Sequence, residues 1–192
     1  VCSSDLGHAL RRDGARAGDL VWVSGRPGLA SLGLARLQGR IELPEPWSRL
    51  CVTALEMPRP RVALGQALVG IASAAIDVSD GLLADLGHIG ERSGLAAAVH
   101  LVQLPHLPKG ETCDADLRRL ALECQLAGGD DYEICFTTPP EQSNAVSAIA
   151  ARLDLPLWCI GSMVAGHAGE VTVLDPDDNP LEFPRRGYDH FA

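Results

Sequence analysis

The stretch Ile76–Ile89, with the sequence IDVSDGLLADLGHI, constrains the fold of this chain more than any other. The apolar segment that leads into it, residues 72–76, is typical of a short buried strand. Beyond the turn, apolar side chains recur at helical spacing, at Leu82, Leu83, Leu86 and Ile89. The sequence therefore predicts a strand, a tight turn and a helix, with Ser79 or Asp80 as the residue that caps the helix N-terminus.

Two carboxylates, Asp77 and Asp80, flank Ser79 in this turn. In an open α/β sheet such a turn lies at the carboxyl end of a strand, where ligands usually bind. A helix N-terminus suits phosphate, but two carboxylates beside it would repel phosphate unless a cation lay between them. Mg²⁺ is typically held by one or two carboxylates together with substrate phosphates. The turn therefore predicts a site for Mg²⁺ and a phosphate; the alternative is that both aspartates only cap and solvate the helix.

A second acidic cluster, GGDDYE at residues 128–133, stands between a predicted helix at 115–126 and a predicted strand at 134–137. The two glycines permit positive φ at the end of the helix. Carboxylates just past a helix C-terminus face the negative end of the helix dipole, which disfavours them. A cationic ligand or metal would relieve this, so the cluster favours a binding site, with a solvated turn as the alternative.

Strands and helices alternate along the rest of the chain, which is compatible with an α/β domain. Strands are predicted at 20–24, 96–101, 157–160 and 171–174, and a hairpin strand at 181–183. Helices are predicted at 29–37, 47–55 and 61–71, and from 139 to 153. Arg61 begins one of these helices, where it either reaches a ligand or is a solvated arginine of the first turn.

Charge and cysteine usage exclude several classes of function. The 192 residues carry 16 basic and 25 acidic side chains, a net charge of −9, and the only lysine is Lys109. Nucleic-acid binding and attraction to anionic membranes are therefore not expected. The six cysteines form no C-x-x-C pair, and no segment has the pattern of a membrane span or a signal peptide. We expect a reduced, cytoplasmic protein.

Three segments together resemble one family: residues 76–89, GGDDYEICFT at 128–137 and GYDHF at 187–191. GDLVWVSGRPG at 18–28 and PRVALGQAL at 60–68 match it as well. The chain resembles the thiamine-monophosphate kinases, of the superfamily that includes aminoimidazole ribonucleotide synthetase. The order and spacing of the motifs over nearly the whole chain make the resemblance specific. It implies transfer of the γ-phosphoryl group of ATP to thiamine monophosphate, with Mg²⁺ required.

The resemblance also assigns roles to individual residues. It implies that Asp77 and Asp80 are Mg²⁺ ligands and that Ser79 contacts ATP, as does Arg12 in the segment before the first strand.

Two further residues are assigned to the thiamine monophosphate substrate in the same way. Glu133 would bind this substrate, and Tyr188 would contact its thiamine part. A cationic thiazolium ring beside a carboxylate and an aromatic face is physically favourable.

For the fold, the resemblance implies an α/β domain with a mixed sheet whose helices pack mainly on one face. Residues 13–192 would be the C-terminal domain of a two-domain kinase, and residues 1–12 the remnant of a connector from an N-terminal domain. That domain would supply a G-D-D metal motif and most of a homodimer interface. Because these 192 residues do not include that domain and its metal ligands, we expect the chain alone to be inactive.

Other functions remain open from the sequence. One is a non-catalytic domain that binds nucleotide or thiamine. Another is a different ATP-using synthetase of the superfamily, such as selenophosphate synthetase, which would need a reactive cysteine or selenocysteine in a glycine-rich N-terminal loop. The last is a plain α/β domain with acidic helix caps.

Overall fold

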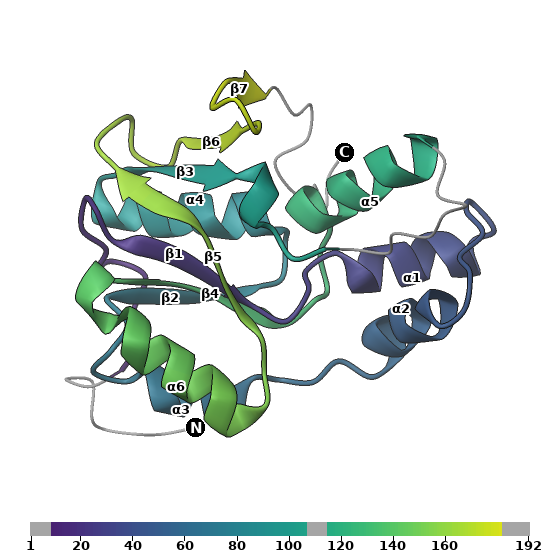
Figure 1. Ribbon diagram of the computed structural model, residues 1–192, viewed down its shortest axis with the longest axis horizontal. Coiled ribbons are helices and arrows are strands. Elements are labelled where there is room, and N and C mark those ends of the chain that lie inside the picture. The colour runs from purple at the N-terminus through teal and green to yellow at the C-terminus, as the bar shows by residue number, and fades with distance from the viewer. Residues whose placement is uncertain (1–8, 107–114, 182–192) are drawn as a thin grey trace.

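The computed structural model describes residues 9–106 and 115–181 of the chain. A seven-stranded sheet with the order β2-β4-β1-β5-β3-β6-β7 runs through the domain (Figure 1). Neighbouring strands are antiparallel except β3 and β6, which are parallel, so the sheet is mixed, as predicted. The strands are β1 Leu20–Ser24, β2 Ala74–Val78, β3 Ala96–His100, β4 Glu133–Thr138, β5 Leu157–Val164, β6 Val171–Leu174 and β7 Pro180–Leu181.

The helices lie close to their predicted positions. They are α1 Leu29–Leu37, α2 Trp47–Glu56, α3 Val62–Leu68, α4 Leu82–Ser93, α5 Ala115–Ala127 and α6 Ser143–Leu153, with short 3-10 turns η1 Leu101–Gln103 and η2 Pro140–Gln142. One shift affects the candidate site: β2 extends to Val78, so Asp77 lies inside the strand and not in the turn after it. Within the described ranges, no helix is both long and apolar enough to span a bilayer.

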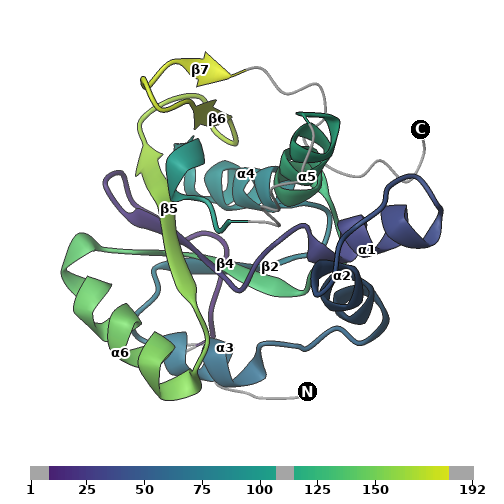
Figure 2. The same cartoon turned by 45° about the vertical axis from the view of Figure 1, so that its right-hand side comes forward.

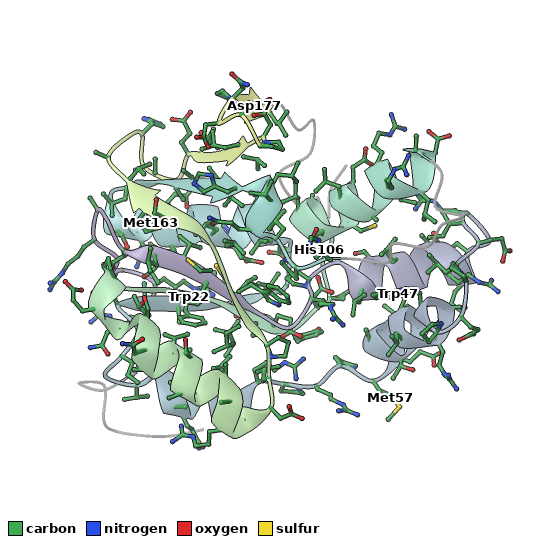
Figure 3. The ribbon with its side chains drawn as sticks, viewed as in Figure 1. Trp22, Trp47, Met57, His106, Met163 and Asp177 are labelled. Carbon is green, nitrogen blue, oxygen red and sulfur yellow. The ribbon has the colours of Figure 1, made fainter. Side chains whose placement is uncertain are left out.

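Helices cover both faces of the sheet, so the expectation that they pack mainly on one face is wrong. In Figure 1, α4 is drawn at a height between β3 and β1, whereas α3 and α6 lie below β2 and β4. The reason is that β1 is apolar at successive positions. Val21 and Val23 join the core on the α4 side, while Trp22 between them joins the core against α3 and α6. Figure 3 labels Trp22, and also Met163, which belongs to the α4 side.

Helices α1 and α2 pack against each other beside the sheet, and a third apolar cluster joins them to α5 (Figure 2). Gly33 of α1 lies so close to α2 that a Cβ atom there would be 2.3 Å from the carbonyl oxygen of Cys51. Cys51 and Cys124 are buried free thiols of this cluster. Burial raises the pKa of Cys51 to about 12 and that of Cys124 to about 11, so both are inert at neutral pH.

Candidate functional site

The motifs singled out in the sequence converge at one edge of the sheet. Strands β1 and β2 both pair antiparallel with β4, which lies between them, so their carboxyl ends meet the amino end of β4. Three connections lie side by side there: residues 25–28 leading to α1, residues 79–81 leading to α4, and residues 128–132 arriving from α5. We call this region the three-loop edge; in Figure 1 it faces α1.

The turn between β2 and α4 is held by Asp85, a residue of the helix itself. Its carboxylate, only 2% exposed, accepts the backbone N–H groups of Ser79 (2.9 Å) and Asp80 (3.1 Å). The N-cap position belongs to Gly81, with φ 125°. The prediction that Ser79 or Asp80 caps α4 is therefore wrong: Gly81 holds the N-cap position, no side chain bonds the helix end there, and Asp85 instead bonds the backbone of Ser79 and Asp80 in the turn before the helix.

This arrangement changes what the turn can bind. Asp85 already occupies the N–H groups of Ser79 and Asp80 in the turn before the helix, so a phosphate there cannot use them. Burial raises the pKa of Asp85, while the same N–H groups favour its charged form. Asp77 is exposed on β2 and Asp80 is half-buried. The turn therefore presents carboxylates, which attract a cation and repel a bare phosphate.

The second acidic cluster is bonded directly to the first. The N–H of Asp130 donates to the carbonyl oxygen of Ser79 (3.0 Å), and the N–H of Tyr132 donates to that of Val78 (3.0 Å). Asp130 and Tyr132 both have positive φ, at 65° and 52°, a conformation that non-glycine residues adopt at a cost. Position 129 requires glycine where this loop packs against the turn, since a Cβ atom would lie 2.4 Å from the carbonyl oxygen of Ser79.

Asp131 points to the third connection and caps α1. Its carboxylate accepts the N–H groups of Gly28 (2.6 Å) and Ala30 (3.2 Å). The positive end of the α1 dipole thus stabilises the carboxylate of Asp131, a role that the sequence predicted for a cationic ligand or metal. Burial, reinforced by the charges of Glu133 and Asp130, nevertheless raises the pKa of Asp131 to about 7.

Glu133, the predicted substrate residue, is 6% exposed and bonded through both of its carboxylate oxygens. Its Oε1 accepts from Arg61 Nη2 (2.5 Å), and its Oε2 accepts from Arg61 Nε (2.7 Å) and from the hydroxyl of Ser24 (2.5 Å). Ser24 Oγ in turn accepts the N–H of Ile134 (2.9 Å). At Gly25, φ is +61° and a Cβ atom would lie 2.0 Å from Glu133 Oε1. Two other chain segments, residues 24–25 and Arg61, thus converge on the carboxylate of Glu133.

The ion pair between Arg61 and Glu133 was not predicted from the sequence. The side chain of Arg61 is 24% exposed and forms a two-pronged ion pair with Glu133, so its interpretation as a solvated arginine is wrong. Pairing with Glu133 raises the pKa of Arg61 above its usual value. The one signal in the sequence was its place in the PRVALGQAL segment, which marks the segment but does not identify its partner.

Arg12, one of the predicted site residues, does not join this edge. Arg12 is exposed at the opposite end of α4, where Ser93 Oγ donates to its carbonyl oxygen (3.2 Å). It lines a cleft of about 400 Å³ with Arg11, Asp13, His88, Glu91 and Arg92. A helix of 12 residues separates it from Ser79 by roughly 18 Å. Tyr188 lies outside the described residues, so its role and that of Arg12 stay predictions.

Asp77 and Asp80 can supply part of a Mg²⁺ coordination shell, but not all of it. Among residues 9–106 and 115–181, no group of three or more His, Cys, Asp or Glu side chains is arranged to hold a metal ion. Asp77 and Asp80 supply two hard oxygen donors at an edge whose neighbouring N–H groups are occupied by Asp85. Mg²⁺ characteristically takes one or two carboxylates and completes its shell with phosphate oxygens and water.

Gly28 tests how tightly the three connections are locked. It has φ +94°, and a Cβ atom would lie 2.6 Å from the Cα of Gln125 in α5. We expect Gly28→Ala to lower the free energy of unfolding by about 3 kcal/mol, since backbone strain adds to backbone overlap. Gly39, just after the same helix, has φ +68° with nothing within 4 Å of the added atom. Gly39→Ala is the matched control and should cost about 1 kcal/mol; equal losses in urea titrations would contradict the close approach.

Comparison with known proteins places these features in context. Residues 16–174 match the family described as AIR synthase related protein, C-terminal domain. The chain is 43% identical over 191 residues to a thiamine-monophosphate kinase of Salmonella typhimurium, covering 97% of this chain and 56% of that protein. It therefore spans about half the length of the curated relatives it matches.

Solved structures agree in fold. A thiamine-monophosphate kinase from Stenotrophomonas maltophilia is 43% identical with a TM-score of 0.78, over 91% of this chain and 55% of that one. The structure named AaThiL complexed with AMPPCP and TMP is 31% identical with a TM-score of 0.71, over 95% and 54% of the two chains.

Proposed function

Because the chain belongs to the AIR synthase related protein family through its C-terminal domain, we propose that it is the C-terminal part of a thiamine-monophosphate kinase. The reaction is transfer of the γ-phosphoryl group of ATP to thiamine monophosphate, giving thiamine diphosphate and ADP. The relatives at 43% identity carry that name, and one related structure is named as a complex with AMPPCP and TMP.

One observation carries this proposal. The turn at 77–81 and the loop at 128–133, two separate motifs of the resemblance, are hydrogen-bonded to each other at the carboxyl ends of β1 and β2. A structural cap would need only one of them. Together they form an acidic surface beside a bidentate arginine–carboxylate pair, which suits a metal-bound phosphate and a charged substrate.

We assign Asp77 and Asp80 as ligands of Mg²⁺, which neutralises phosphate charge when bound. Ser79 and Arg12 are assigned to ATP; since they lie at opposite ends of α4, one nucleotide touching both would extend along that helix. Glu133 and Tyr188 are assigned to thiamine monophosphate.

The chain's place in a larger protein is also part of the proposal. Residues 13–192 form the C-terminal domain and residues 1–12 the connector from an N-terminal domain, which supplies the remaining metal ligands and the contacts of a homodimer. The buried free thiols Cys51, Cys124 and Cys135 support a reducing, cytoplasmic location.

The experiment compares the 192-residue chain with the intact protein that contains it. Both are incubated with ATP, Mg²⁺ and thiamine monophosphate, and thiamine diphosphate and ADP are quantified. We expect turnover by the intact protein and none by the chain alone, because Asp77 near the end of β2 and Asp80 in the turn after it are an incomplete metal site. Product from the chain alone would contradict the proposal that an N-terminal domain supplies the remaining metal ligands. Binding without turnover by the intact protein would favour a nucleotide- or thiamine-binding domain.

A further inference from the structure

The Arg61–Glu133 pair is the most deeply buried ion pair among the described residues. The side chain of Glu133 is 8% exposed and that of Arg61 24%, whereas one partner or both are largely exposed in the pairs Arg11–Asp13, His88–Glu91 and Arg119–Glu123. Arg61 therefore covers Glu133. A ligand that approaches from solvent meets the guanidinium first and the carboxylate only behind it.

The hydrogen bonds show which donors of Arg61 and acceptors of Glu133 the ion pair already uses. Both oxygens of Glu133 accept hydrogen bonds from Arg61, and Oε2 accepts a third from Ser24. A guanidinium carries five N–H groups, and the pair uses one on Nε and one on Nη2. The N–H groups left over form a planar donor set that matches phosphate oxygens.

We propose that Arg61 binds the phosphate group of the substrate monoester directly, and that Glu133 is a positioning residue that orients this arginine. The inference rests on the proposed function and refines one of its assignments, because Glu133 then serves the binding of thiamine monophosphate through Arg61 and not by contact with the thiazolium ring. The three-loop edge carries exposed or half-buried carboxylates at Asp77, Asp80 and Asp130, so a fixed guanidinium beside them is where an anionic substrate gains most. Ser24 and Gly25 serve the same end, because one bonds the carboxylate and the other leaves room for it.

The alternative is that Glu133, and not Arg61, contacts the substrate. If the thiazolium cation of thiamine contacts Glu133 itself, Arg61 must move away, because it occupies the same oxygens. Removing Arg61 would then improve the binding of thiamine and thiamine monophosphate alike. Removing the charge of Glu133 would weaken both equally.

The test compares thiamine monophosphate with thiamine, which has the same cation but no phosphate. In the intact protein we would measure the KM for thiamine monophosphate, the inhibition constant of thiamine and the calorimetric affinity for each without ATP. The variants are Arg61→Gln, Arg61→Lys and Glu133→Gln. The control is Arg59→Gln, which makes the same charge change at an exposed residue two positions away.

We expect Arg61→Gln to weaken thiamine monophosphate binding by about 10- to 100-fold, the range of a charge-assisted hydrogen bond. Thiamine binding should change less than about threefold, Arg61→Lys should restore part of the loss, and Arg59→Gln should match the wild type. Glu133→Gln should weaken the monophosphate and spare thiamine.

Other outcomes overturn the proposal. Equal loss of both ligands in Glu133→Gln, or unchanged or improved affinity for the monophosphate in Arg61→Gln, would do so. If Arg61→Gln does not fold, Arg61→Lys decides, since it keeps the charge but not the fork. If the wild-type protein phosphorylates the monophosphate but the variants give one of these contrary results, only the role of Arg61 is refuted. A wild-type protein that neither binds nor phosphorylates it refutes the proposed function as well.

Discussion

Replacing Asp77 and Asp80 together by asparagine is expected to lower kcat/KM for thiamine monophosphate by about 1,000-fold or more in the intact protein. A metal ion contributes several kcal/mol of charge stabilisation in phosphoryl transfer, and tenfold in rate corresponds to about 1.4 kcal/mol. Asparagine keeps the volume of each side chain but removes the charge that attracts Mg²⁺. The N–H groups of the turn cannot substitute for the metal at the phosphate, because Asp85 holds those of Ser79 and Asp80.

The controls for this prediction separate metal binding from folding. Asp177→Asn removes one carboxylate from the exposed β6–β7 turn, far from the three-loop edge in Figure 3, and should leave the rate unchanged. The single variant Asp77→Asn should keep the wild-type free energy of unfolding, since Asp77 is exposed on β2, and the double variant should require higher Mg²⁺ for any residual rate. A double variant that turns over at the wild-type rate would remove the basis for the metal site.

Much of the secondary structure was predictable because local signals agreed with the fold. The strand at Leu20–Ser24, the helix at Leu29–Leu37 and the strand–turn–helix around Gly81 all lie where apolar periodicity and glycine place them. The distribution of helices over the sheet was not predictable from spacing alone. A strand that is apolar at consecutive positions is buried on both faces, but it does not specify which helices cover each face.

The site was predictable as two acidic motifs but not as one arrangement. Their contact depends on β4 lying between β1 and β2, which is a property of sheet topology and not of either motif. The pairing of Arg61 with Glu133 joins residues 72 positions apart, and Asp131 bonds Gly28 across 103 positions. The prediction of the α4 cap was wrong for a related reason. In the sequence Asp85 is an ordinary helix residue, and only the fold brings its carboxylate back to the N–H groups of Ser79 and Asp80.

Asp131 should make the stability of the 192-residue chain fall as the pH rises from 5 to 8. Its pKa is raised to about 7 in the folded chain from an ordinary 3.8, so between these values the folded state binds more protons than the unfolded state. The stabilisation that this carboxyl group contributes is therefore complete below pH 3.8 and is lost as the pH passes through 7. The difference sets an upper limit of about 4 kcal/mol on the loss.

Urea unfolding of the wild type and of Asp131→Asn across this pH range measures the effect, because their difference cancels the titrating groups that do not interact with Asp131. We expect that difference to change by several kcal/mol in favour of the variant as the pH rises. Asp175→Asn is the control: backbone N–H donation from Asn179 holds the pKa of Asp175 below its ordinary value, so this group stays ionised throughout and its variant should keep the wild-type slope. Parallel curves for the wild type and Asp131→Asn would mean that the α1 dipole, acting through Gly28 and Ala30, outweighs burial and keeps Asp131 charged.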